Sequence, residues 1–304
     1  MRNQRGQTSW VAIIAMAVVG VLLLGLPLLL HFSQKRHNEL QFDVEKAFPP
    51  GEQVASGMVF AETLARIVEH ELDSCTGWRP NDFVLWGPAL WADNNSNRQL
   101  GILQAVREST RVFKDHLTKV SSDQFDANLV RADTAFRNDL FKFWFPSAES
   151  KLREGVKALR TYQDGLRATP PRSRPINLRN VELIRLFQAW TDLLGDVHAR
   201  LYRTDAGFFR TDDEFYYCQG IAHALYYLVL AVGHEYREAF AGRAVLVTLL
   251  GEVAQPLHRA ATLKPLLVLD GAPDGLFANH RRNLDGYISE ARQKMYSIRE
   301  ELEK

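Results

Sequence analysis

One uninterrupted hydrophobic stretch lies near the amino terminus. The 21 positions from Trp10 to Leu30 are apolar apart from glycine and Pro27, and no Asp, Glu, Lys or Arg lies between Gly6 and Gln34. At about 1.5 Å rise per residue, a helix of this length measures about 30 Å, which matches the hydrocarbon thickness of a bilayer. Because the stretch is apolar on every face, it predicts a transmembrane helix rather than a core helix of a water-soluble domain.

A cleaved signal peptide is the alternative for this stretch. Its apolar region is usually shorter, roughly 7 to 15 residues, and a small-x-small cleavage site follows it. The residues after Leu30 are His-Phe-Ser-Gln, which make a poor cleavage site. The sequence therefore predicts an uncleaved anchor, in this organisation: a tail at 1–9, a transmembrane helix at 10–32, a linker at 33–56 and a helical domain at 57–304.

After residue 57, apolar residues recur at helical spacing, and no stretch of useful length alternates with period two. We therefore expect an all-α, bundle-like domain. Capping-box patterns at Ser121 and Thr211 and a serine at Ser147 mark expected helix starts, and Pro256 is expected to interrupt a helix. A stiff segment with three prolines suggests two subdomains divided near 168–176. The expected helices cover about 59–73, 99–120, 121–143, 147–167, 178–202, 211–241, 244–262 and 284–302.

A long irregular connection is expected between residues 74 and 97. Loops beyond about 12 to 15 residues are uncommon unless they are functional or disordered, and the aromatic residues here argue against disorder. Trp78, Trp86 and Trp91 are candidate binding residues. Such rings could stack on sugars or lie at a membrane interface. Covering the core beneath the loop is the favoured interpretation.

The helix expected after Thr211 carries the candidate chemistry. His223, His234 and Glu238 are candidate catalytic residues, and Tyr227, on the same stripe, is a candidate binding residue. The two histidines are 11 residues apart, about 16 Å along the axis, so they cannot share one metal ion. The sequence also lacks the paired Glu-x-x-His motifs of carboxylate-bridged centres. Histidines hydrogen-bonded inside a helical core are therefore favoured, and neither a metal nor a cofactor is predicted.

Charge and composition narrow the function classes further. Of 304 residues, 46% are hydrophobic, which is ordinary for a globular protein. Four basic and no acidic residues occur up to Arg36, which leaves a net charge of −3 on the rest of the chain. No concentrated basic face for nucleic acid is expected. Cys75 and Cys218 would permit one disulfide outside the cytoplasm, and two buried thiols are an equally good interpretation.

Five sequence stretches together resemble an uncharacterised family of bacterial single-pass membrane proteins, the domain of unknown function 2333. The resemblance covers nearly the whole chain and implies a bacterial inner-membrane protein of the cell envelope. It implies no activity and no catalytic residues, because no chemistry is assigned to the family. The stretches are Gly77–Asp82 (GWRPND), Gln99–Leu103 (QLGIL), Trp144–Ser150 (WFPSAES), Thr211–Tyr217 (TDDEFYY) and Asp274–His280 (DGLFANH).

These observations favour a non-enzymatic scaffold or interaction domain anchored in the inner membrane. Its expected partners are the lipid bilayer through residues 10–32, other envelope proteins or cell-wall material, and not nucleic acid. The charges flanking the anchor slightly favour a cytoplasmic amino terminus and a periplasmic domain. The alternative is a membrane-tethered hydrolase or metal-dependent enzyme that uses His223 and His234. Common catalytic motifs, including Gly-x-Ser-x-Gly, His-Glu-x-x-His and Cys-x-x-Cys, are absent from the sequence.

Overall fold

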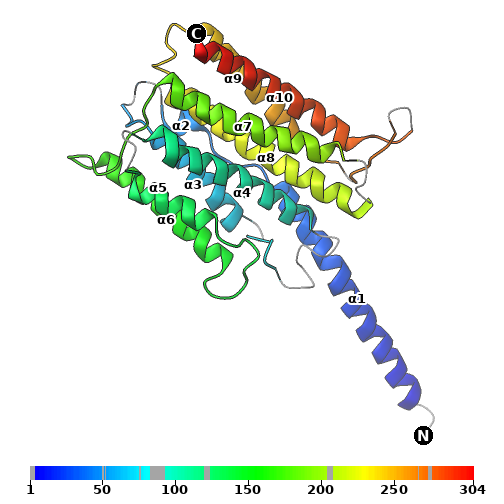
Figure 1. Ribbon diagram of the computed structural model, residues 1–304. Helices are drawn as coiled ribbons and strands as arrows, with labels where there is room; N and C mark the ends of the chain where they lie inside the picture. Colours follow the sequence, from blue (N-terminus) through cyan, green and yellow to red (C-terminus); the bar gives the residue numbers. More distant parts are fainter. Residues whose placement is uncertain are drawn as a thin grey trace.

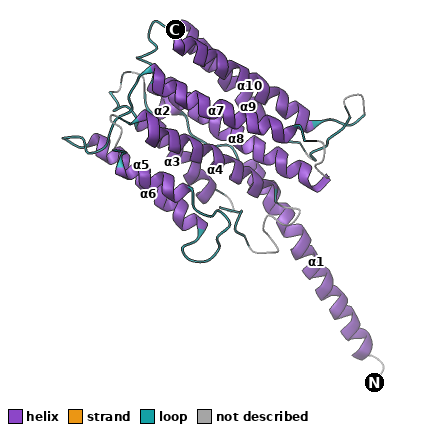
Figure 2. Ribbon diagram, in the orientation of Figure 1, coloured by secondary structure: helices purple, strands orange, loops and turns teal. Residues whose placement is uncertain are grey.

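The computed structural model describes residues 4–49, 51, 53–74, 77–82, 93–119, 124–203, 208–265, 267–272 and 276–304. Within these ranges the chain is helical (Figure 2), and strand-like pairing is limited to an isolated bridge between Asp270 and Asn279. The prediction of an all-α fold is confirmed. The elements are α1 (Gln4–Arg36), α2 (Val44–Ala47), α3 (Met58–Asp73), α4 (Asn94–Val112), the π-helical turn η1 (Phe113–Leu117), α5 (Ala127–Phe136), α6 (Ala148–Arg167), α7 (Asn180–Leu201), α8 (Phe208–Glu235), α9 (Ala244–Ala261) and α10 (His280–Glu303).

The helices from α3 onward stack side by side (Figure 1). The pair α9 and α10 lies against α7 and α8, α4 lies against α8, α3 packs between α8 and α6, and α5 packs on α6. The long helix α1 projects from one end of this stack. We call this the anchor end; it is formed by the carboxyl ends of α3, α5, α7 and α9 and the amino ends of α4, α6, α8 and α10.

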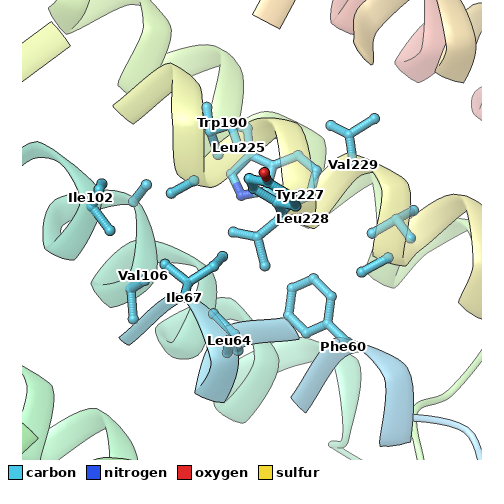
Figure 3. Packing of buried hydrophobic residues seen from close by; sticks show 14 of the residues in the cluster. Phe60, Leu64, Ile67, Ile102, Val106, Trp190, Leu225, Tyr227, Leu228 and Val229 are labelled. Carbon is cyan, nitrogen blue, oxygen red and sulfur yellow. The ribbon is translucent and has the colours of Figure 1, made fainter. Parts of the chain in front are cut away.

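The buried apolar core is continuous through the stack. At its centre, Phe60 of α3, Ile102 of α4 and Leu228 of α8 are fully buried against one another's helices (Figure 3). The same cluster includes Leu159 of α6 and Leu194 of α7, which flank the proline-rich segment in sequence. Helices on both sides of that segment therefore share one core.

Two glycines allow α4 and α8 to pack with their backbones in contact. A Cβ atom at Gly101 would lie 1.9 Å from the carbonyl oxygen of Tyr217, and one at Gly220 would lie 2.0 Å from that of Arg98. Both distances are far below van der Waals contact, so only glycine fits at this crossing. The close approach places the side chains that flank the crossing, including Arg98, deep in the domain.

Several helix starts agree with the sequence patterns. The hydroxyl of Ser147 accepts a hydrogen bond from the Ser150 amide at 3.3 Å, so the predicted cap of α6 is confirmed. Asp126 caps α5 and Asn279 caps α10 in the same manner, through side-chain oxygens that accept amide hydrogens of the first turn. The expected cap at Ser121 lies outside the described residues.

Other expected boundaries are wrong. The helix expected to start at Thr211 already begins at Phe208, so Thr211 lies inside α8 and does not cap it. Helix α9 continues through Pro256, because the buried side chains of its turn hold it to the core despite the lost backbone donor. Helix α5 ends at Phe136, where the guanidinium of Arg107 binds the carbonyl oxygens of Phe136 and Asn138 at 2.6 and 2.7 Å and replaces the next helical turn.

Helix α1 presents exposed apolar side chains to its surroundings. Among the described side chains, those of the stretch Trp10–Leu22 form an apolar segment shorter than a membrane span. The described helix with the length and hydropathy of a span is Arg210–Glu235, and 83% of its most apolar window is buried inside the domain, as in the core helix of a globular protein. The large apolar side chains exposed on α1 are Trp10, Val11, Ile13, Ile14, Met16, Val18, Val19, Val21, Leu22, Leu29 and Phe32.

Candidate functional site

The polar stripe of α8 binds the segment that follows α1. This segment, residues 37–49, crosses the domain surface, and we call it the strap. Its backbone carbonyl oxygens accept hydrogen bonds from side chains of α3, α4 and α8. The pairs are His70 Nε2 with His37 O at 2.8 Å, Arg98 Nη2 with Asn38 O at 2.6 Å, Tyr227 Oη with Leu40 O at 2.8 Å and His234 Nε2 with Phe48 O at 2.7 Å.

Apolar contacts complete the attachment of the strap. Leu40, Val44 and Phe48 are buried in the main core cluster. The carboxylate of Asp43 caps the short helix α2 by accepting the Glu45 and Lys46 amides, which fixes the turn that directs these side chains inward. The segment predicted as a linker at 33–56 therefore lies packed on the domain over much of its length.

The junction between α1 and the domain is also held by polar contacts. Lys35 Nζ donates to the carbonyl oxygen of Pro265 at 2.7 Å and to the hydroxyl of Tyr216 at 3.1 Å. Burial, followed by the neighbouring charge of Lys264, lowers the pKa of Lys35. Glu39 pairs with Lys264 at 2.7 Å. The last turn of α1 is thus fixed to the ends of α8 and α9 before the strap begins.

A buried ion pair lies beneath the strap. Arg98 Nη1 and Glu71 Oε1 are 3.1 Å apart, and each side chain is only 2% exposed. Arg98 also donates a hydrogen bond to the carbonyl oxygen of Asn38, so its guanidinium links α3 to the strap. Burial, and then the positive charge of Arg98, holds the pKa of the nearby His223 well below its ordinary value, so this histidine is neutral. Its ring packs edge-on against Tyr227 at a centroid distance of 5.1 Å.

A carboxylate at the end of α8 caps α3 from outside that helix. Glu235 Oε1 accepts from the Gly57 amide at 2.5 Å, and Oε2 accepts from the Phe60 amide at 3.1 Å. Burial raises the pKa of Glu235 to about 7, against the opposing effect of these backbone hydrogen bonds. Gly57 adopts φ +98°, and a side chain there would meet the Tyr162 hydroxyl. The junction of α3, α6 and α8 therefore requires glycine at this position.

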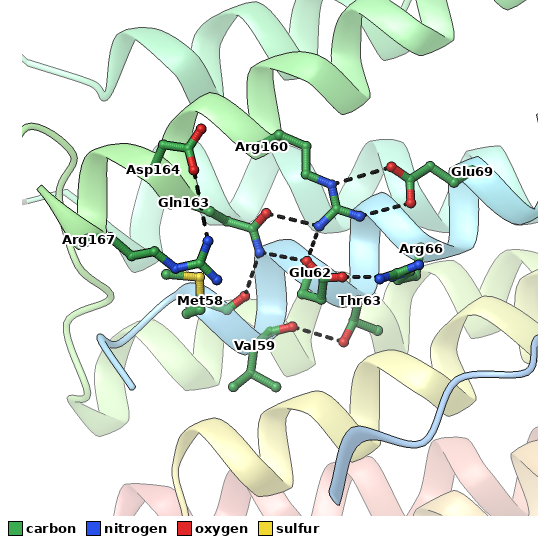
Figure 4. Close-up of polar contacts among 10 residues, drawn as sticks. All are labelled: Met58, Val59, Glu62, Thr63, Arg66, Glu69, Arg160, Gln163, Asp164 and Arg167. Carbon is green, nitrogen blue, oxygen red and sulfur yellow. Dashed lines mark hydrogen bonds and ion pairs between the residues drawn. The ribbon is translucent and has the colours of Figure 1, made fainter. Parts of the chain in front are cut away.

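A solvent-facing groove of about 1310 Å³ lies between the strap, α3 and α6. Arg160 of α6 spans its wall, where it pairs with Glu69 at 2.8 Å and contacts Glu62 (Figure 4). Gln163 also donates to Glu62 at 2.9 Å. Burial acts to raise the pKa of Glu62, but hydrogen bonds from Gln163 and Arg66 and the charge of Arg160 hold it below its ordinary value. The positive charges of Arg66 and Arg160 are therefore paired with the negative charges of Glu62 and Glu69.

The catalytic and binding residues predicted from the sequence have different surroundings in the structure. His234 and Tyr227 both hold the strap, whereas His223 is buried beside Arg98, and Glu238 is exposed on the turns after α8. Trp78 is buried and donates through Nε1 to the Leu140 carbonyl oxygen at 3.1 Å. Trp86 and Trp91 lie outside the described residues. Among the described side chains, no group of three or more His, Cys, Asp or Glu residues is placed to hold a metal ion.

The structure describes one of the two cysteines, Cys218. Cys218 is a free, fully buried thiol whose Sγ lies 3.9 Å from the carbonyl oxygen of Val197. Burial raises its pKa far above the ordinary range, so the thiol is protonated. Cys75, the other half of the disulfide that the sequence permits, lies outside the described residues.

Sequence reasoning missed Arg98, Glu71 and Glu235, which hold the strap or join the helices near it. A signal was available: Arg98 and Glu71 are charged residues at positions that helical periodicity places on buried faces of α4 and α3. Charged side chains are rarely buried without a partner. The partner, however, follows only from the tertiary arrangement.

Comparison with known proteins agrees with the resemblance seen in the sequence. A family model described as an uncharacterised protein conserved in bacteria, DUF2333, matches residues 3–206 and 195–304, which together span nearly the whole chain. No curated protein and no solved structure matches the chain. The chain therefore belongs to the bacterial DUF2333 family.

Proposed function

We propose that this chain is a membrane-anchored protein of the bacterial cell envelope, whose helical domain acts as a non-enzymatic scaffold or interaction module. One observation carries the proposal: α1 exposes apolar side chains along its length, while the strap that follows it is bound to the domain by four side-chain hydrogen bonds. An exposed apolar helix is unfavourable in water and favourable in lipid. The strap then holds the domain against the anchor.

The site supports an interaction role better than catalysis. The polar groups of α8 are used to bind the strap, because Tyr227 and His234 donate to its carbonyl oxygens. The neutral His223 is shielded from solvent. In the adjacent groove, Arg160 is already paired with two carboxylates. A catalytic acid or base needs access to a substrate, and these side chains contact other parts of the protein instead.

For the compartment, we propose the inner membrane with the amino terminus in the cytoplasm and the domain in the periplasm. The bias of basic residues toward the amino terminus supports this orientation only slightly, since Lys35 and Arg36 flank the other side of α1. Reporter fusions at the carboxyl terminus test it directly. Alkaline phosphatase fused there should be active and green fluorescent protein dark; the reverse pattern would place the domain in the cytoplasm.

The interaction role is tested by affinity purification of the full chain from detergent extracts and by its retention on purified cell-wall material. We expect one reproducible envelope partner or specific retention on the wall. A chain that recovers neither would contradict the scaffold proposal. Activity screening of a His234→Ala variant, with the wild type beside it, addresses the enzymatic alternative: an activity lost in the variant but present in the wild type would overturn the proposal.

A further inference from the structure

The anchor end of the domain has no spacer between it and α1. Phe32 is the last large apolar side chain exposed on α1, and Lys35 already binds Tyr216 and Pro265 of the domain. Three residues of helix correspond to about 4.5 Å. If α1 crosses a bilayer, as proposed above, the anchor end must therefore lie directly on the membrane surface.

An aromatic loop occupies this end. The segment between α5 and α6, residues 137–147, lies on the side of the stack from which α1 projects (Figure 1). Phe141 lines a cavity together with Tyr217, the neighbour in sequence of the Tyr216 that binds α1. Four rings of the loop are largely exposed: Phe141 at 55%, Phe143 at 53%, Trp144 at 78% and Phe145 at 92%.

The structure holds this loop in place with its rings outward. The buried indole of Trp78 binds the carbonyl oxygen of Leu140 at 3.1 Å, and Asn81 Nδ2 binds that of Lys142 at 3.1 Å. The Ala148 amide donates to the same Lys142 oxygen at 2.9 Å and closes the loop. Its backbone is therefore fixed at both ends, and the exposed rings are presented by a supported loop.

A second apolar tip lies at the same end. Leu276 and Phe277, in the connection between α9 and α10, are 101% and 72% exposed. This connection begins beside Pro265, which accepts the hydrogen bond from Lys35 of α1. At the opposite end of the stack, Phe125 lies under the ammonium groups of two lysines and is 42% exposed, and the more exposed apolar side chains are the smaller Val181, Val245 and Val247.

We propose that the aromatic loop and the Leu276–Phe277 tip insert into the interface of the same bilayer that holds α1, and so fix the domain at three points on the membrane. The inference rests on the proposed membrane anchoring. Tryptophan and phenylalanine are favoured at the boundary of headgroups and acyl chains. Contiguous exposed apolar side chains mark contact surfaces, and the absence of a spacer selects lipid as the contacting surface.

Photocrosslinking in intact cells tests this placement in the full chain. Phe145 is replaced by the photoreactive analogue p-benzoylphenylalanine, which the high exposure of this side chain accommodates without changing the core. The matched control is the same analogue at Val181, which is 63% exposed at the amino end of α7, away from the anchor end. After irradiation, mass spectrometry of the purified chain should find phospholipid adducts at position 145 and not at position 181.

Each other result counts against the inference. A protein adduct at position 145 would identify the loop as a protein-binding surface. The absence of a lipid adduct there, in a chain that fractionates with membranes, would show that α1 is inserted while the loop stays in water. If the chain does not fractionate with membranes at all, the proposed anchoring itself fails, so failure of the two proposals is distinguishable.

Discussion

At the residue scale, removing one partner of the buried pair of Arg98 and Glu71 should strongly destabilise the fold, because the other partner stays buried. In an Arg98→Met variant, the Glu71 carboxyl would be left buried without its ion-pair partner, and the strap would lose the hydrogen bond at Asn38. We expect the free energy of unfolding to fall by about 3 to 5 kcal/mol, the usual result of breaking a buried pair. Urea unfolding of the full chain in detergent micelles, followed by circular dichroism, measures this loss.

The control for that variant is Arg153→Met. Arg153 pairs with Asp73 at 2.7 Å, but both side chains are more than half exposed. An exposed pair contributes roughly 0 to 1 kcal/mol. Equal losses in the two variants would show that Arg98 is not held in the buried pair described above.

Glu235 gives the domain a specific pH dependence. Its pKa rises from an ordinary value of 4.5 to about 7 on folding, so the folded state favours the protonated carboxyl. The stabilisation by this group is complete below pH 4.5 and is lost as the pH rises through 7. The shift in the pKa of Glu235 corresponds to a change of about 3 kcal/mol in the free energy of unfolding. The free energy of unfolding, measured from pH 4.5 to 8, should show this decline in the wild type relative to Glu235→Gln. Because both proteins share all other titrating groups, the difference between them isolates the contribution of Glu235. A wild-type advantage that stayed constant with pH would contradict the assignment.

At the scale of helices, the crossing of α4 and α8 depends on glycine. Gly220→Ala would place a methyl group against the carbonyl oxygen of Arg98, so the helices must move apart. We expect a loss of about 1 to 3 kcal/mol, typical of overpacking, despite the higher helix propensity of alanine. Thermal unfolding detects it as a lower midpoint.

The matched control is Gly251→Ala in α9, where a Cβ atom would meet nothing within 4 Å. Removing glycine from such a helix interior stabilises it by about 0.5 to 1 kcal/mol. The two substitutions should therefore have opposite signs. Stabilisation by both would mean that α4 and α8 are not in backbone contact.

The strap should loosen when its hydrogen bonds are removed singly. Tyr227→Phe deletes the hydroxyl that binds the Leu40 carbonyl oxygen and leaves the ring in place, at a cost of about 0.5 to 1.5 kcal/mol. Peptides covering residues 37–48 should then exchange amide hydrogens faster. Tyr202→Phe, at the carboxyl end of α7, is the control. Unchanged exchange of the strap in Tyr227→Phe would contradict the role assigned to this hydroxyl.

Sequence periodicity predicted most helices because burying one face of a helix leaves a local signal. In α10, the stripe formed by Leu284, Ile288 and Met295 is fully buried, as its spacing predicted. Helix ends were harder to predict because tertiary partners decide them. The guanidinium of Arg107, in α4, binds the carbonyl oxygens at the end of α5. In α9, packing of buried side chains keeps the helix continuous through Pro256.

At the scale of the whole molecule, the polar stripe of α8 shows where sequence reasoning stopped. Spacing placed Tyr227 and His234 on one face of a helix, but it could not show that the strap, nearly 190 residues earlier, occupies that face. His234, which the sequence favoured as a hydrogen-bonded core histidine, is half-buried and hydrogen-bonded to the strap. Long-range pairing leaves no periodic signal, so Arg98, Glu71 and Glu235 could not be identified as a group.

The strap holds α1 and the domain together as one body. The last turn of α1 binds α8 and the segment after α9, and the next twelve residues bind α3, α4 and α8. A domain on a free linker would sample many orientations. This domain instead keeps a fixed face toward the end from which α1 projects, and the proposed scaffold at a membrane surface would need such a fixed orientation.

The most direct test of this account is alkaline carbonate extraction of membranes from cells that express the full chain. Carbonate releases proteins that are bound to the surface and leaves those that are inserted through a hydrophobic helix. We predict that the chain stays in the membrane pellet and is released only by detergent. Recovery of the intact chain in the carbonate supernatant would contradict the account.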